Sequence, residues 1–110
     1  MNLQKRSALY YLTENGRCPF EEWLANLKDV QGKAIIRARI RRMELGNPGQ
    51  YRWIDNGVLE LKINFGPGYR IYFGEDGKEI IVLLCGGDKS TQERDIRKAQ
   101  EFWDDYRRSK

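Results

Sequence analysis

Four polar side chains fall on two strand-like runs of the sequence that are joined by a short turn rich in glycine and proline. Glu60 and Lys62 precede the turn, and Arg70 and Tyr72 follow it. If the runs pair as a hairpin across residues 66–68, with even-numbered residues opposite even-numbered ones, all four share the non-core face of a sheet. There, two cations could bind a phosphate while a carboxylate, an amine or a phenol moves a proton. The alternative interpretation is a solvated sheet face with weak ion pairs.

The chain contains no histidine. This excludes an imidazole base, a Ser-His-Asp triad and a metal site with histidine ligands. Cys18 and Cys85 do not form a C-x-x-C pair, and we expect both to be small, reduced, buried residues. We expect neither a metal site nor a cofactor.

A second cluster lies at residues 86–91, which read Gly-Gly-Asp-Lys-Ser-Thr and lead from a strand into a helix. Backbone amides at a helix start can hold an anion, and Lys89 would add a positive charge. The spacing differs from that of a nucleotide-binding P-loop, so ATP is not implied. A capped helix start without a ligand explains the same residues.

A basic stretch without acidic residues runs from residue 33 to residue 42. Its cations flank an apolar helical seam on both sides. This arrangement is typical of an ordinary exposed helix, and it also suits a helix that contacts nucleic-acid phosphates. The candidates for phosphate contact are Lys33, Arg37 and Arg41.

Arg52 is a further candidate for nucleic-acid contact. It precedes Trp53 in an expected polar loop over residues 49–56. An exposed aromatic side chain beside an arginine can stack on a base or on a partner protein.

Hydrophobic periodicity and turn signals place these residues on seven elements, in the order β-α-α-β-β-β-α of an α+β fold. The run over residues 80–85 is apolar throughout, which predicts an interior strand covered on both faces. The last helix opens with a Ser-Thr-Gln-Glu capping-box pattern and carries one apolar stripe. Strands are expected over residues 5–13, 58–64, 69–73 and 80–85. Helices are expected over 19–27, from a cap at Asp29 to residue 45, and from 90 onward.

Length and composition predict a single domain over residues 1–110. The chain is 40% hydrophobic and 33% charged, which suits a folded core under a strongly solvated surface. Its net charge of +4 favours a polyanionic partner. No apolar run approaches the roughly 18–20 residues of a membrane-spanning helix, and the first residues do not resemble an export signal. We therefore expect a cytoplasmic protein without a membrane partner.

Three runs along the chain resemble the RelE/ParE toxin superfamily, and more closely its HigB-like "addiction module killer" branch. The first helix, with Phe20, Trp23 and Leu24, also fits that branch. The similarity extends over nearly the whole chain and implies a small, twisted, largely antiparallel sheet packed with helices. The runs are GVLELKI at 57–63, GPGYRIYF at 66–73 and LLCGGDKSTQ at 83–92.

The resemblance implies the toxin of a type II toxin-antitoxin module. Such a toxin is neutralised by a cognate antitoxin, usually of the helix-turn-helix type. Members of the RelE and HigB type are ribosome-dependent mRNA endonucleases. They need no metal, because the attacking group is the 2′-OH of the RNA itself. The candidate RNA contacts are then Lys33, Arg37, Arg41, Arg52 and Tyr72.

The resemblance also assigns catalytic roles. Arg70 would bind the scissile phosphate, because a guanidinium offers two parallel donors to the developing charge. Glu60 or Lys62 would take the proton of the 2′-OH. Lys89 or Tyr72 would assist the leaving 5′-oxygen.

Two other functions fit the same sequence. ParE-like members share the fold but inhibit DNA gyrase and are not nucleases, so the fold alone does not identify the target. A basic binding module that is no longer toxic is the other alternative. The presence of Lys62, Arg70 and Lys89 favours RNA cleavage.

Overall fold

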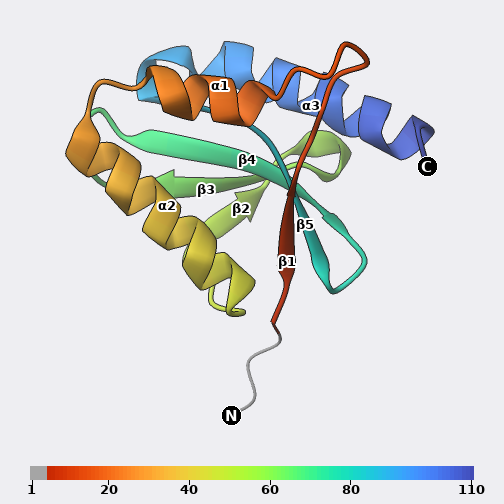
Figure 1. The fold of residues 1–110 in the computed structure, drawn as a ribbon, viewed down its shortest axis with the longest axis horizontal. Helices are drawn as coiled ribbons and strands as arrows, with labels where there is room; N and C mark the ends of the chain where they lie inside the picture. The colour runs from red at the N-terminus through yellow and green to blue at the C-terminus, as the bar shows by residue number, and fades with distance from the viewer. Residues whose placement is uncertain (1–4) are drawn as a thin grey trace.

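One mixed five-stranded sheet forms the centre of the protein, which we describe over residues 5–110 from a computed structural model. The strand order is β1-β5-β4-β3-β2; β1 runs parallel to β5, and all other neighbours are antiparallel. The sheet and helices confirm the predicted α+β class (Figure 1). The strands are β1 (Ser7–Tyr10), β2 (Tyr51–Trp53), β3 (Leu59–Ile63), β4 (Tyr69–Asp76) and β5 (Ile80–Asp88).

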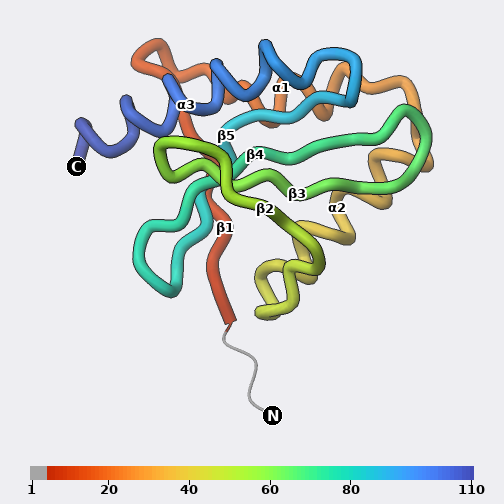
Figure 2. The backbone as a smooth tube through the Cα atoms, turned by 180° about the vertical axis from the view of Figure 1, so that it is seen from behind, coloured from red at the N-terminus to blue at the C-terminus, as the bar shows by residue number. Residues whose placement is uncertain are grey.

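Three helices cover the two faces of the sheet. Helices α1 (Pro19–Asn26) and α2 (Val30–Glu44) pack on one face, and α3 (Gln92–Arg108) packs on the other. Figure 2 shows the molecule from behind, with α3 in front of α1. No helix within residues 5–110 is long and apolar enough to cross a membrane. The first four residues, considered above for an export signal, lie outside the described part.

The element order agrees with the prediction except that β2 is an additional strand, in the stretch expected to be a polar loop. All three of its residues are exposed at the edge of the sheet, so no alternating burial pattern reveals it. Strand β1 is shorter than predicted, and β4 and β5 are longer. The interior position of β5, between β1 and β4, is confirmed.

Each face of the sheet has its own hydrophobic core. Leu59, Leu61 and Ile63 point into the core under α1 and α2, as their alternation predicts. The face predicted to lie away from the core carries a second core under α3, so it is not a solvated face. Buried residues of this second core are Tyr11, Val58, Tyr72, Val82, Leu84, Cys85, Ala99 and Trp103.

The hairpin between β3 and β4 has the predicted register. Glu60 lies opposite Tyr72 and Lys62 lies opposite Arg70, so all four side chains share one face. Gly66 and Gly68 have φ angles of +55° and +81°, a conformation that side chains with a Cβ rarely adopt. The turn therefore depends on these glycines, and it sets the register of the candidate site.

A bulge in β5 changes which residues face α3. Tyr72 pairs with Cys85 whereas Phe73 pairs with Leu83, so Leu84 is an extra residue in β5. Leu84 and Cys85 consequently both lie in the core under α3. The uninterrupted apolar run in this segment gave no sign of the bulge.

Two glycines of the sheet lie directly beneath tryptophan rings. A Cβ added to Gly86 would lie 2.3 Å from the ring of Trp23 in α1, and one added to Gly74 would lie 2.5 Å from Trp103 in α3. Each indole therefore packs against bare backbone, one on each face of the sheet.

The helix termini combine confirmed and corrected predictions. Asp29 caps α2 by accepting a hydrogen bond from the Gly32 amide at 2.9 Å, as predicted. The expected capping box at residues 90–93 is wrong. Asp88 instead caps the short 3₁₀ turn that precedes α3, with Thr91 as its reciprocal partner, and α3 begins at Gln92.

Candidate functional site

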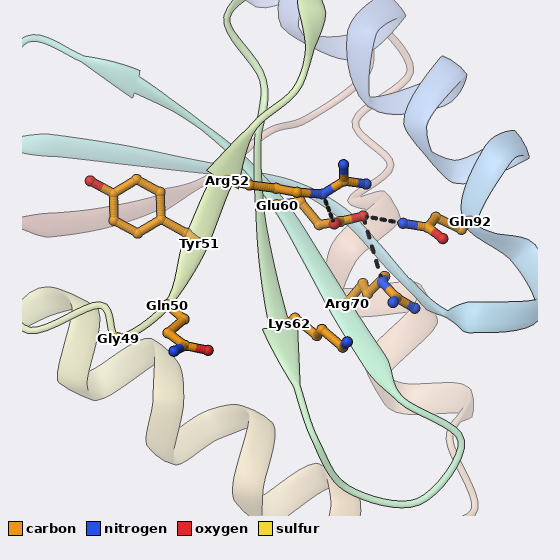
Figure 3. Close-up of a pocket in the computed structure, with 8 residues that line it drawn as sticks. All are labelled: Gly49, Gln50, Tyr51, Arg52, Glu60, Lys62, Arg70 and Gln92. Carbon is orange, nitrogen blue, oxygen red and sulfur yellow. Dashed lines mark hydrogen bonds and ion pairs between the residues drawn. The ribbon is translucent and has the colours of Figure 1, made fainter.

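A cavity of about 590 Å³ opens between β2, the β3–β4 hairpin and the first residue of α3 (Figure 3). It contains Glu60, Lys62 and Arg70 of the four predicted catalytic residues, together with Arg52. Its polar wall also includes Gln50 and Gln92. The ring of Tyr51 points away from this wall and packs edge-on against Phe73, with ring centroids 6.2 Å apart. The complete lining is Gly49, Gln50, Tyr51, Arg52, Glu60, Lys62, Arg70 and Gln92.

Glu60 is the buried centre of the hydrogen-bond network in this cavity. Its side chain is 3% exposed, and Arg52 Nε donates to its Oε1 at 2.7 Å. The Tyr72 hydroxyl and Gln92 Nε2 each donate to its Oε2 at 2.9 Å. Burial raises the pKa of Glu60, but the hydrogen bonds from Arg52, Gln92 and Tyr72 outweigh burial and leave the pKa below its ordinary value.

These contacts argue against Glu60 as the general base. Both of its oxygens already accept hydrogen bonds, and a carboxylate with a lowered pKa is a weak proton acceptor. Glu60 holds the neighbouring side chains in position instead. The sequence could not distinguish these roles, because the donors come from β2, β4 and α3, which are separate in the chain.

Arg70 is almost completely buried, yet its guanidinium has few partners. The residue is 6% exposed. Within residues 5–110 its one hydrogen bond runs from Nη1 to the Gly68 carbonyl, at 3.5 Å. Its Nε has no hydrogen-bond partner and lies 3.6 Å from Glu60 Oε2. Because Nε is buried beside Glu60, the remaining donors of Nη1 and Nη2 are the ones available to an anion in the cavity.

The charges lining the cavity favour an anionic ligand. Lys62, Arg52 and Arg70 supply three cations, whereas Glu60 is the single carboxylate in the lining. Glu60 is also bound to Arg52, so it compensates Arg70 only in part. An excess of positive charge around a buried guanidinium suits a phosphate group.

Tyr72 cannot contact RNA in this structure, which corrects the prediction that it does. The residue has no exposed surface, because α3 covers this face of the sheet. Burial, followed by the nearby charge of Glu60, raises the pKa of its phenol strongly. Tyr72 is therefore a protonated donor to Glu60, and it is not in reach of a leaving oxygen.

Lys89 lies beside the cavity and outside its lining. It lines an adjoining hollow of about 480 Å³ that shares Gln92 with the first cavity. A Cβ added to Gly68 would lie 3.8 Å from Lys89 Cβ and 4.0 Å from Arg70 Nη1, so the side chains of Lys89 and Arg70 both begin or end near the same glycine. The anion site proposed at the helix start is occupied by the protein itself, because the Asp88 carboxylate accepts from the Ser90 amide at 2.8 Å.

The structure does not bring Lys33, Arg37 and Arg41 to the cavity. These three form one stripe at helical spacing. On this stripe Lys33 donates to the Ala25 carbonyl of α1 at 3.3 Å. Arg37 lies near Tyr10 of β1, at the opposite edge of the sheet from β2, and its charge opposes a rise in the Tyr10 pKa that comes mainly from burial.

Two other arginines of the same basic stretch, Arg39 and Arg42 of α2, lie next to the site, although they were not among the RNA contacts chosen from the sequence. The sequence could not identify them, because cations flank the apolar seam of α2 on both sides. Gln50 and Gln92 were also missed. No sequence signal distinguishes them from ordinary surface glutamines.

Arg52 lines the cavity, and its Nε donates to Glu60. Trp53 is 65% exposed but does not share this face. It pairs with Leu59, whose side chain enters the core under α1 and α2. An aromatic platform at Trp53 would therefore lie on the other side of the sheet.

Within residues 5–110 no group of three or more side chains of the metal-binding types lies close enough together to hold a metal ion. Both cysteines are free, with Cys85 buried as predicted and Cys18 half-buried. Burial, with a smaller contribution from Asp95, raises the pKa of the Cys85 thiol to about 12. Cys85 is therefore a packing residue and a poor nucleophile.

A protein of Haemophilus influenzae described as "Uncharacterized protein" is 46% identical to this chain over 81 residues. The match covers 74% of this chain and 82% of the relative. This chain therefore belongs to the same family as the Haemophilus influenzae protein. No model of a known protein family matches the chain. The observed fold is consistent with a RelE-like architecture.

Proposed function

We propose that this protein is the toxin of a type II toxin-antitoxin module of the RelE/HigB-like kind, acting as a ribosome-dependent mRNA endonuclease. The observation that carries the proposal is the buried guanidinium of Arg70. It opens into a cationic cavity and has most of its hydrogen-bonding capacity unused. A buried cation of this kind suits a phosphate whose negative charge increases during a reaction.

The reaction needs a phosphate clamp and two proton transfers. The 2′-oxygen of the RNA attacks the adjacent phosphorus, and the bond from phosphorus to the 5′-oxygen breaks. One proton leaves the 2′-OH and another reaches the departing 5′-oxygen. The products are a 2′,3′-cyclic phosphate and a free 5′-OH, so no cofactor or co-reactant is consumed.

We propose different roles for the residues around the cavity. Arg70 donates to the non-bridging oxygens of the phosphate. Lys62 stands opposite Arg70 on β3, with its amine beside the cavity. It is our candidate to take the proton of the 2′-OH, a step in which it acts as the neutral amine. Lys89, on the other flank of Arg70, is our candidate on the side of the 5′-oxygen. Glu60 is a positioning residue, because it approaches Arg70 and both of its oxygens already accept hydrogen bonds from the protein.

The proposal includes a cognate antitoxin as the protein partner. A cavity whose lining has more cations than carboxylates would attract an acidic segment as well as RNA, so an antitoxin could inhibit by occupying it. We expect an antitoxin of the helix-turn-helix type encoded next to this protein.

The test is primer extension on a defined mRNA incubated with the purified protein, with and without translating ribosomes. We expect discrete cuts that require ribosomes and disappear in Arg70→Ala. Cuts that persist in Arg70→Ala would come from a contaminating nuclease or another site. An intact message in the presence of ribosomes would refute the proposal, and gyrase supercoiling would then be the activity to assay.

A further inference from the structure

The cavity that contains Arg70 continues into a second cavity along α2. The second cavity has a volume of about 410 Å³ and shares Gly49, Gln50 and Lys62 with the first. Its other polar side chains are Arg39 and Arg42 of α2 and Asn64. The two cavities therefore form one continuous surface, with Lys62 between them.

The second cavity is cationic and has one apolar wall. Arg39, Arg42 and Lys62 supply three positive charges, and none of the described residues that line it is a carboxylate. Ile35 and Phe65 contribute apolar surface beside these cations. Cations next to an apolar wall suit a nucleotide, because its phosphate is charged whereas its base and sugar have apolar surface.

Arg39 is held in this cavity with unused donors. Its Nη2 donates to the Pro48 carbonyl at 3.3 Å, and its buried Nε has no partner in the described part of the chain. Burial, and then the charge of Arg42, lower the pKa of Arg39. A partly desolvated Arg39 is thus placed near the like charge of the exposed Arg42, without an anion from the described residues.

The loop before β2 fits closely over Arg39. Gly49 has a φ of +79°, and a Cβ at this position would lie 2.7 Å from Arg39 Nη2. Gly49 lines both cavities, so its missing side chain helps keep the surface between them open.

From this geometry we infer that the second cavity binds another phosphate of the same RNA strand whose scissile phosphate lies at Arg70. The inference rests on the proposed function for the identity of the ligand. The strand runs from Arg39 and Arg42 past Lys62 to Arg70. The protein consequently binds a segment of single-stranded RNA through at least two of its phosphates.

The experiment measures binding of 2′-O-methyl oligoadenylates, which have no 2′-OH proton and cannot be cleaved by this reaction. A dinucleotide with a single phosphodiester and a pentanucleotide are compared by titration at several salt concentrations. The variants are Arg42→Gln and, as the matched control, Arg41→Gln. Both arginines are exposed and lie in the last turn of α2, so each variant loses the same charge near the helix terminus.

We expect Arg42→Gln to weaken pentanucleotide binding about fivefold to tenfold at low salt and to reduce the salt slope by about 0.7, as for one lost phosphate contact. The affinity of Arg42→Gln for the dinucleotide, which binds at Arg70, should change by less than about twofold. The affinity of Arg41→Gln for either oligonucleotide should also change by less than about twofold. Thermal unfolding of the variants verifies that both fold.

Equal losses in Arg42→Gln and Arg41→Gln would overturn the inference, because the effect would then be that of general charge. An unchanged pentanucleotide affinity in Arg42→Gln, or no binding by the wild type, would also overturn it. Ribosome-dependent cleavage by the wild type is scored separately. If the wild type cleaves but the two variants bind the pentanucleotide equally, the second subsite alone is refuted. If the two variants differ in binding as expected but the wild type does not cleave, the proposed nuclease alone is refuted.

Discussion

Replacing Arg70 by lysine keeps a positive charge in the cavity and removes the planar pair of donors that a phosphate would use. Among the described residues the guanidinium makes one long hydrogen bond, of 3.5 Å, to Gly68 and approaches Glu60 to 3.6 Å. Most of its donors are therefore free for the substrate. An ammonium group cannot reproduce two parallel N–H donors.

The expected loss of activity follows from these contacts. Removing one well-placed donor to a developing oxyanion costs about 10²–10³ in rate, or roughly 2.7–4 kcal/mol. Arg70→Lys should fall in this range in a single-turnover primer-extension assay with saturating ribosomes.

The effect of the same substitution on stability should be small. Glu60 keeps its hydrogen bonds from Arg52, Tyr72 and Gln92, all at 2.9 Å or less. Because the approach of Arg70 at 3.6 Å is too long for a hydrogen bond, we expect its loss to change the free energy of unfolding by about 1 kcal/mol or less. Urea unfolding measures this change.

Arg37→Lys is the matched control, because Arg37 lies on α2 toward β1 and away from the cavity. It should cut at the wild-type rate. If Arg70→Lys also cuts within about threefold of the wild type, the guanidinium does not clamp the reacting phosphate and the reasoning is refuted.

Three further substitutions test the surroundings of the site. Glu60→Gln should destabilise the protein by about 2–4 kcal/mol at neutral pH, because buried Arg70 loses its counter-charge. Because the pKa of Glu60 is lowered in the folded protein, its ionised form stabilises the protein above the unfolded pKa of about 4.3. The difference in free energy of unfolding between wild type and Glu60→Gln should therefore shrink as the pH falls below that value. If urea unfolding gives the same difference at neutral and acid pH, the reasoning is contradicted. Tyr72→Phe should lower the free energy of unfolding by about 1 kcal/mol and leave the cleavage rate within about threefold of wild type. A cleavage rate that falls about tenfold or more would show that the buried hydroxyl takes part in the reaction. Gly74→Ala should lower the free energy of unfolding by more than about 2 kcal/mol, because its Cβ would lie 2.5 Å from the Trp103 ring. Gly77→Ala is the control, since nothing lies within 4 Å of its Cβ, and it should lose only the roughly 1 kcal/mol that its positive φ costs. Equal changes in melting temperature would contradict the contact with Trp103.

The hairpin that carries the site could be predicted from sequence because its information is local. The alternation of residues 59–63 and the Gly-Pro-Gly turn fix which side chains share a face, and the observed pairing of Lys62 with Arg70 agrees. The α2 cap at Asp29 is similarly local.

The burial of the site could not be predicted, because it depends on which face α3 covers. The apolar stripe of α3 is evident in the sequence, but the stripe alone does not indicate which face of the sheet it packs against. Once α3 covers this face, Glu60 and Tyr72 become buried partners instead of solvated groups. Strand β2 is a second case, since its three exposed residues are defined by pairing with β3 alone.

The two indoles that lie on bare backbone give each layer of the protein its own optical reporter. Trp23 belongs to α1 and Trp103 to α3, on opposite faces of the sheet, whereas Trp53 is already largely in water. Changing Trp23 to phenylalanine leaves fluorescence that responds mainly to α3, and changing Trp103 leaves fluorescence that responds mainly to α1. Detachment of one helix, by denaturant or by a bound protein, can thus be observed separately from detachment of the other, without an added label.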